Sequence, residues 1–257
     1  MVGRTAVEIE GSGDAIIMLH GLGGTSNTWA PLMPSLTRFQ TIRIDLPGSG
    51  RSHLVEGPIS IDSLVKAVER VLTTLNISKA HVVGHSMGTI IATHLASKTK
   101  LVRSLLLFGP LLCPPDGARA NIKARAVKAR GEGVVGMQAI ADVLVQASTS
   151  TESKQKRLAS VAFVRETLMR QCPDGYARNC DALSEAQAAD TSRIACPTLL
   201  ITGEEDVVSP PQAVRSMSEK IANSRMEVLR GCGHWTTIEM PDECASLTRQ
   251  FYTQRFA

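Results

Sequence analysis

The sequence lacks any apolar stretch of the roughly 18 residues that a membrane-spanning helix needs. Its first residues, MVGRTAVEIEGSGD, include acidic side chains and no apolar core, so we expect no signal peptide. The six cysteines are scattered and form no CxxC pair, which argues against a metal or redox site. We therefore expect reduced thiols, a cytosolic location and no bound metal.

A strong charge of one sign is also lacking. The chain has 28 basic and 24 acidic residues, and a net charge of +4 is too small to favour nucleic acid or a membrane as a partner. Hydrophobic residues make up 43% of the 257 residues, which excludes disordered and fibrous classes of protein. This length suits one large domain or one domain with an insertion.

Short apolar runs alternate with helical patterns along most of the chain. We predict strands at 15–20, 41–44, 81–84, 104–108, 197–202 and 226–229, and helices at 61–75, 87–97, 211–221 and 242–251. This alternation of doubly apolar strands and helices is typical of a mostly parallel α/β sheet. Between these regions the pattern changes, because residues 111–190 show no strong strand and indicate several short helices. We therefore predict a core of residues 1–110 and 191–257, divided by a helical insertion of residues 111–190.

The segment Gly84-His-Ser86-Met-Gly88 is the only G-x-S-x-G in the chain. It follows an apolar strand and opens a helix, which is the setting of a nucleophilic serine. Ser86 must adopt a strained φ at such a turn, and strand and helix can approach closely because the two glycines have no Cβ. We predict that Ser86 is a nucleophile.

A serine hydroxyl needs a neighbouring base, and the base needs an acid that orients it. His234 lies in a Gly-rich loop after the last strand, and such a loop reaches the same sheet edge as Ser86. The other five histidines fit this role less well: His20, His53, His81, His85 and His94. We predict that His234 is the base.

Three carboxylates follow the strand at 197–202, namely Glu204, Glu205 and Asp206. We favour Asp206 as the acid because an apolar pair and the Ser-Pro that starts the next helix come after it, although either glutamate stays open. The order Ser86, Asp206, His234 differs from the orders found in the two classes of serine protease.

The loop His20-Gly-Leu-Gly-Gly24 follows the first strong strand. We predict that the backbone N–H groups of Leu22 and Met87 stabilise an oxyanion. A phosphate-binding role is weak, because the loop lacks the G-x-G-x-x-G pattern and no Lys-Ser/Thr pair follows it.

Substrate contacts are harder to predict. We expect that five residues contribute to the substrate pocket: Gly21, Met137, Leu144, Phe163 and Trp235. The segment 119–130 carries five basic residues and no acidic one. It is either a site for a substrate carboxylate or a solvated helical face, and the sequence leaves both interpretations open.

Taken together, these motifs resemble the α/β-hydrolase superfamily over nearly the whole chain, and look most like its 3-oxoadipate enol-lactonase, lactonase and carboxylesterase branch. The segments that carry the resemblance are 20–24, 45–52, 84–88, 203–210 and 233–234. The resemblance implies an eight-stranded, mostly parallel sheet flanked by helices, with a helical cap inserted after the sixth strand. It also implies the triad Ser86, Asp206 and His234.

We therefore expect a cofactor-free serine hydrolase that cleaves an ester or lactone of a small molecule. Two other reactions remain open on the same triad: hydrolysis of a C–C bond in meta-cleavage dienoates, and cofactor-free perhydrolysis. A hydrolase-like hormone receptor is a remote alternative of a different class.

Overall fold

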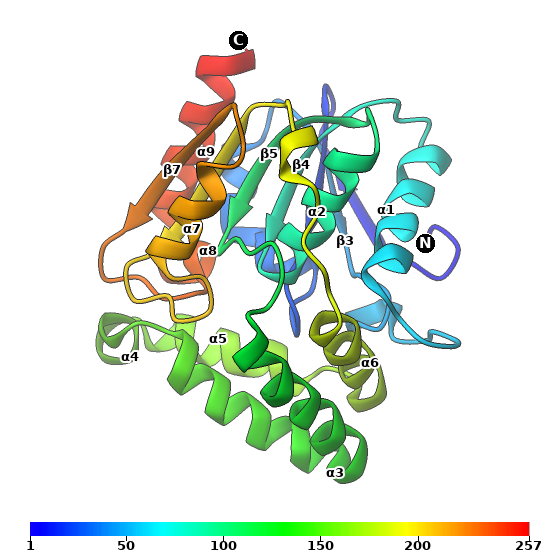
Figure 1. Ribbon diagram of the computed structural model, residues 1–257, viewed down its shortest axis with the longest axis vertical. Helices are drawn as coiled ribbons and strands as arrows, with labels where there is room; N and C mark the ends of the chain where they lie inside the picture. Colours follow the sequence, from blue (N-terminus) through cyan, green and yellow to red (C-terminus); the bar gives the residue numbers. More distant parts are fainter. Residues whose placement is uncertain (257) are drawn as a thin grey trace.

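The computed structural model describes residues 1–256 of the chain, and side chains as far as residue 254. Seven strands form one sheet in the order β1-β3-β2-β4-β5-β6-β7 (Figure 1). Their bounds are β1 (Val7–Glu10), β2 (Ala15–Leu19), β3 (Gln40–Ile44), β4 (Ala80–His85), β5 (Val102–Phe108), β6 (Thr198–Gly203) and β7 (Ser224–Leu229). All neighbouring strands are parallel except β1, which pairs antiparallel with β3. The prediction of a mostly parallel α/β sheet is confirmed.

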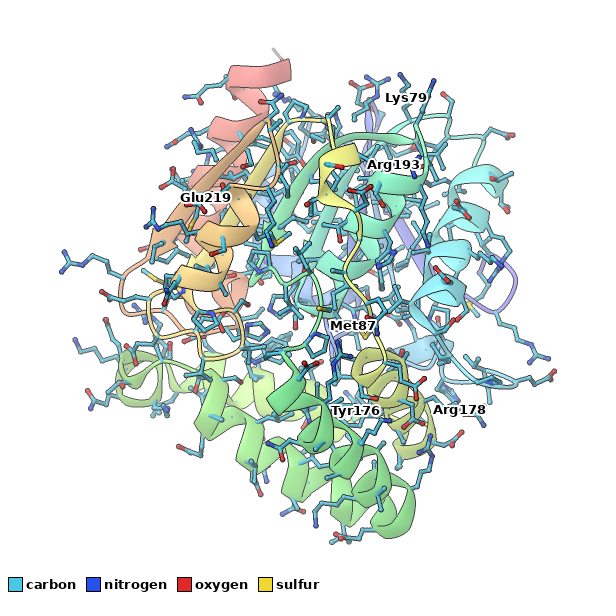
Figure 2. All side chains as sticks on the ribbon, in the orientation of Figure 1. Lys79, Met87, Tyr176, Arg178, Arg193 and Glu219 are labelled. Carbon is cyan, nitrogen blue, oxygen red and sulfur yellow. The ribbon has the colours of Figure 1, made fainter. Side chains whose placement is uncertain are left out.

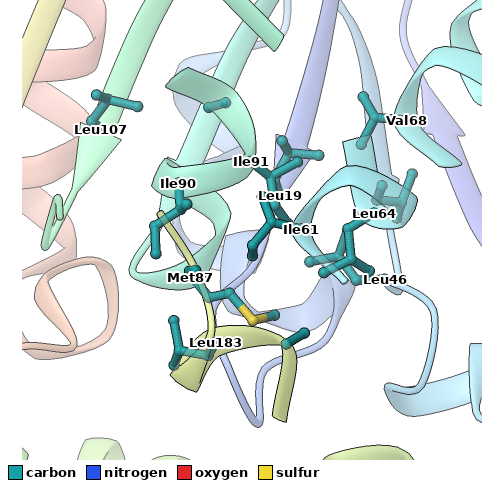
Figure 3. Packing of buried hydrophobic residues seen from close by; sticks show 14 of the residues in the cluster. Leu19, Leu46, Ile61, Leu64, Val68, Met87, Ile90, Ile91, Leu107 and Leu183 are labelled. Carbon is teal, nitrogen blue, oxygen red and sulfur yellow. The ribbon is translucent and has the colours of Figure 1, made fainter. Parts of the chain in front are cut away.

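The period of two in the strands divides the core between the two faces of the sheet. In β2, Ile17 and Leu19 belong to one apolar cluster, whereas Ile16 and Met18 belong to another. Figure 3 shows part of the first cluster, in which Leu19 packs with residues of two helices. These runs are apolar throughout because helices cover both faces of the sheet.

Helices lie on both sides of the sheet (Figure 1). One side carries α1 (Ile61–Thr74), α2 (Met87–Lys98) and α7 (Pro211–Ser218). The other carries the 3₁₀ helix η1 (Ser26–Ser35), α8 (Thr236–Glu239) and α9 (Pro241–Phe256). Two single 3₁₀ turns, η2 (Gly50–Ser52) and η3 (Thr191–Arg193), lie in connecting segments.

Four helices between β5 and β6 form a separate layer beneath the sheet, near the carboxyl ends of its strands (Figure 1). They are α3 (Asp116–Ser148), α4 (Thr151–Lys156), α5 (Leu158–Met169) and α6 (Pro173–Ser184). Helix α3 spans 33 residues but is interrupted at Gly133, whose φ of 59° and ψ of −131° are not helical. The division of the chain at residues 110 and 191 stays a prediction, and Ala257 lies outside the described residues.

The strand count differs from the expectation. The described residues form seven strands rather than eight, and the helical layer follows the fifth strand rather than the sixth. The residues before β1 form no strand, because Val2 and Thr5 hydrogen-bond to each other across a tight turn at Gly3. Strand β1 itself was not anticipated, since VEIE alternates polar and apolar residues at the edge of the sheet.

None of the described helices is long and apolar enough to cross a membrane.

Helix α2 packs closely against β2 at Gly88. A Cβ atom built on Gly88 would lie 2.0 Å from the carbonyl oxygen of Leu19, so a side chain there would force backbone apart. We expect Gly88→Ala to lower the free energy of unfolding by about 1–3 kcal/mol, the usual cost of overpacking. Urea denaturation measures this change.

Gly131→Ala in α3 is the matched control, because a Cβ there meets nothing within 4 Å. We expect it to leave stability unchanged or raise it by up to about 1 kcal/mol. A Gly88→Ala protein as stable as the wild type would contradict the close approach.

Candidate active site

Ser86 lies at the turn between β4 and α2. Its φ of 52° and ψ of −119° are rare for a residue with a side chain, and confirm the strained backbone expected at this motif. The glycines on either side allow the turn, because a Cβ on Gly84 would lie 2.8 Å from the carbonyl oxygen of Gly88. The turn is further held by a hydrogen bond from the Ser86 N–H to the carbonyl oxygen of Phe108.

His234 and Asp206 meet although they lie 28 residues apart. The ring donates from Nδ1 to Oδ2 of Asp206 over 2.8 Å, and both side chains are almost completely buried. The other carboxylate oxygen, Oδ1, accepts the backbone N–H groups of Val208 and Ser209, each at 2.8 Å. Burial alone raises the pKa of Asp206, but the adjacent His234 and these amides together lower it to about 2. Asp206 is therefore ionised at neutral pH and fixes the orientation of the His234 ring.

The two alternative acids have other partners. Glu205 accepts hydrogen bonds of 2.8 Å from the N–H and hydroxyl of Thr151, at the start of α4. Glu204 accepts the backbone N–H of Gly231 at 3.2 Å. Neither glutamate contacts His234 by any hydrogen bond found among the described residues, so the geometry selects Asp206.

The loop of residues 20–24 lies directly beside Ser86. A Cβ on Gly21 would lie 2.8 Å from Cβ of Ser86, so only glycine fits there. The buried ring of His20 holds the loop by donating to the Gly21 carbonyl at 2.8 Å and accepting the Leu46 N–H at 2.9 Å. Met87 is the first residue of α2, and its N–H has no acceptor within the helix. Leu22 lines the same cavity as Ser86, and Met87 follows Ser86 in the chain, while their role in binding an oxyanion stays a prediction.

Ser86 and His234 open into the same cavity, which has a volume of about 420 Å³ and lies between the sheet and the helical layer. Leu144 and Trp235 line it, as predicted, and Leu22 lines it too. Gly21, also predicted for the pocket, lies beside Ser86 but is not among the lining residues. Most of the remaining lining residues are apolar: Leu111, Pro114, Pro115, Ala118, Ile122, Val143, Leu168, Leu183, Val207 and Val208. This volume and lining suit a small, largely apolar ligand.

Two residues predicted to line the pocket lie elsewhere. Met137 is fully buried in the larger apolar cluster, because it packs inside the helical layer. Phe163 lines a different, polar cavity between α5 and the loops near β1 and β3. The side chain of Met87 is buried in the larger apolar cluster, to which Leu183 of α6 also belongs (Figure 3). Figure 2 labels this methionine on the sheet side and Tyr176 on the helical side of the same junction.

His85, which was not predicted to belong to the site, lies against His234 in the structure. Its ring donates from Nε2 to the carbonyl oxygen of His234 at 3.0 Å, and its centroid lies 5.0 Å from that of the His234 ring. Burial and the neighbouring His234 lower the pKa of His85 to about 3, so the ring is neutral. The pattern alone contained no signal for this contact, because the two histidines are 149 residues apart.

Glu239 was also missed. This buried carboxylate accepts the backbone N–H groups of Gly233 and Trp235, on either side of His234, at 3.1 Å each. It also accepts the Ser150 N–H and the Ser153 hydroxyl, both at 2.8 Å. One side chain thus joins the His234 loop to the start of α4.

A family model described as the alpha/beta hydrolase fold matches residues 14–241, and the chain belongs to this family. The resemblance and the fold class inferred from the sequence are therefore confirmed, apart from the strand count and the position of the insertion.

Individual relatives share less than a third of their aligned residues with this chain. The chain is 29% identical over 98% of its length to 2-hydroxymuconate semialdehyde hydrolase of Pseudomonas sp. strain CF600, and covers 91% of it. It is 27% identical over 94% of its length to 3-oxoadipate enol-lactonase 1 of Acinetobacter baylyi, and covers 90% of it. The solved structure of the enol-lactonase from Burkholderia xenovorans LB400 matches with a TM-score of 0.89 and 27% identity, over 97% of this chain and 96% of that one. The fold and these relatives support a hydrolase.

The neutral His85 predicts how stability depends on pH. An unfolded chain protonates this histidine near its ordinary pKa of 6.5, whereas the folded protein resists protonation until about pH 3. The unfolded state therefore binds more protons between these values, and acidification destabilises the fold. We expect His85→Gln, which keeps a donor for His234, to reduce the loss of stability between pH 7 and pH 5 by about 2 kcal/mol.

Urea denaturation at both pH values tests this expectation. The control is His53→Gln, at an exposed histidine, which we expect to leave the pH dependence of stability as in the wild type. Equal pH dependence in the His85→Gln and wild-type proteins would contradict a buried neutral ring.

Glu239→Ala removes the acceptor of four hydrogen bonds at once. Since each donor left unpaired in a buried place costs about 1–3 kcal/mol, we expect a loss of at least about 3 kcal/mol in the free energy of unfolding. We also expect faster hydrogen exchange at the amides of Gly233, Trp235 and Ser150, measured by mass spectrometry. Glu243→Ala, at an exposed acidic residue of α9, is the control. Similar hydrogen exchange in the two variants would refute the role of Glu239.

Proposed function

We propose that this protein is a serine hydrolase that cleaves an ester or lactone of a small molecule through an acyl-enzyme. The observation that carries the proposal is the placement of Ser86 and the Asp206–His234 pair on one apolar cavity. Neither part suffices alone, because the serine needs a base and the base needs a fixed orientation. Membership of the hydrolase family and similarity to an enol-lactonase agree with it.

In the proposed acylation step, Ser86 Oγ attacks the carbonyl carbon while His234 Nε2 takes its proton. The carbonyl oxygen becomes an oxyanion, which the N–H groups of Leu22 and Met87 bind. Asp206 stays ionised and stabilises the imidazolium. His234 then gives its proton to the alcohol oxygen as the C–O bond breaks, which leaves an acyl group on Ser86.

In deacylation, water enters where the alcohol left. His234 takes a proton from the water as its oxygen attacks the acyl carbon, and returns a proton to Ser86 Oγ as the ester bond to the enzyme breaks. For a lactone, both products are one hydroxy acid. These steps use only side chains and backbone groups of this chain together with water.

Cleavage of a C–C bond is the second candidate, because the hydrolases most similar to this chain include 2-hydroxymuconate semialdehyde hydrolase. The same serine, base and oxyanion site serve either reaction. A panel of p-nitrophenyl esters, simple lactones and coloured dienoates separates them by which substrates have the higher kcat/KM.

Ser86→Ala removes the proposed nucleophile without changing the fold around it. We expect hydrolysis of p-nitrophenyl acetate to fall at least about 1,000-fold, as it does when a triad serine is removed. A fluorophosphonate is expected to add one covalent group to the wild type, on the peptide that contains Ser86, and none to the variant. Mass spectrometry locates the label.

The control is Ser216→Ala, at an exposed serine of α7, which should keep full activity and labelling. Undiminished ester hydrolysis by Ser86→Ala, or a label on another residue, would refute the assignment.

A further inference from the structure

The five basic residues of segment 119–130 do not share one environment. Four of them form ion pairs with acidic side chains: Arg119 with Asp116, Lys123 with Glu185, Lys128 with Glu132, and Arg130 with Asp181. Arg125 has no acidic partner among the described residues. These contacts assign four of the charges to ordinary surface pairing and leave one to be explained.

Arg125 is also the one charged residue of this segment that lines the cavity of Ser86 and His234. It lies on α3 one turn after Ile122 and Asn121, which line the cavity too. Within the described part of the chain, no other lining residue carries a permanent charge. A half-buried arginine thus lies in the wall of an otherwise largely apolar cavity.

The protein groups around Arg125 do not neutralise it. Its neighbours on α6 are the buried Tyr176 hydroxyl and Cys180 thiol. Burial raises the pKa of both groups, that of Cys180 to about 11, and the positive charge of Arg125 only partly opposes these shifts. Both groups are therefore neutral at physiological pH, and the charge of Arg125 is left without an anion.

A charge in an apolar wall is costly unless an opposite charge accompanies it. A guanidinium fits a carboxylate especially well, because its planar donors bind both carboxylate oxygens at once. We infer that Arg125 binds a carboxylate of the substrate, on the helical side of the cavity, while the scissile carbonyl lies at Ser86 on the sheet side. This inference rests on the proposed function and narrows it to monoesters and lactones that carry a second, ionised carboxyl group.

The two ends of such a substrate would contact different layers of the fold, because Ser86 lies at the turn between β4 and α2 and Arg125 lies on α3 of the helical layer (Figure 1). The carboxylate would therefore act on binding and orientation, and not on the bond-breaking steps themselves. Its removal is expected to raise KM more than it lowers kcat.

A pair of aryl esters tests this inference. The first is mono-p-nitrophenyl adipate, which carries a free carboxylate, and the second is its methyl-capped diester, which is neutral. We expect the wild type to prefer the acid. A hydrogen bond to a charged group is worth about one to two factors of ten, so Arg125→Gln should lower kcat/KM for the acid about ten- to hundredfold, mainly through KM. The neutral ester should change less than about twofold, because it makes no use of the charge.

Lys123→Gln is the control, since it removes an equal charge from the same helix at a solvent-exposed position. We expect both esters to react with it as with the wild type. Equal losses in Lys123→Gln and Arg125→Gln would assign the effect to the general field of the helix and overturn the inference.

A binding measurement separates this inference from the proposed function. Calorimetry with Ser86→Ala compares monomethyl adipate with dimethyl adipate, and needs no turnover. We expect tighter binding of the acid, by about tenfold or more, and loss of that preference in the double variant with Arg125→Gln.

The outcomes differ for the two proposals. Suppose that the wild type cleaves neutral esters through Ser86, but that neither the wild type in kcat/KM nor Ser86→Ala in binding prefers the acid to the diester. The role of Arg125 is then wrong and the proposed function stands. If no ester is cleaved, the proposed function is wrong, and the binding comparison alone decides the role of Arg125. Should Arg125→Gln fail to fold, a lack of preference for the acid in Ser86→Ala alone overturns the inference, and a preference supports it.

Discussion

The close approach of α2 to the sheet is the constraint on which the site depends. Ser86 adopts a φ of 52° at a turn where α2 lies too close to β4 for a Cβ on Gly84, and too close to β2 for a Cβ on Gly88. That packing supplies the energy that keeps a strained residue in place. It also fixes the start of α2, so that the serine hydroxyl and the N–H of Met87 are presented together at the end of β4.

The His234 loop depends on contacts from several directions. Its backbone is bound by His85 from the nucleophile turn, by Glu239 from α8, and by Ser148, whose carbonyl accepts the His234 N–H at 2.8 Å. Since Ser148 ends α3, the position of His234 is coupled to the helical layer that forms the wall of the cavity. The two layers are therefore parts of one site, and a change in the position of α3 would reach His234 directly.

How much of this follows from the sequence varies with the element. The five central strands β2 to β6 are predictable because continuous apolar runs can be buried only between two helical layers. The edge strand β1 escapes notice because its alternation of valine or isoleucine with glutamate is short and half-exposed. Residues 111–190 indicate several short helices, and three short helices do form there, but the first helix, α3, spans 33 residues across a break at Gly133 because neighbouring helices stabilise it.

The sequence by itself determined the residue types of the candidate site. They are a serine between two glycines at the end of β4, acids at the end of β6, and a histidine in the loop after β7. Local backbone geometry needs those residue types at those spacings, so the pattern is visible without the fold. Only the tertiary structure places Asp206, rather than either glutamate beside it, against His234, and Arg125, rather than the four other basic residues near it, in the cavity lining. These choices depend on contacts between distant segments, Glu205 with Thr151 and Arg130 with Asp181 among them, which satisfy the neighbouring charges and leave one carboxylate for His234 and one guanidinium for the cavity.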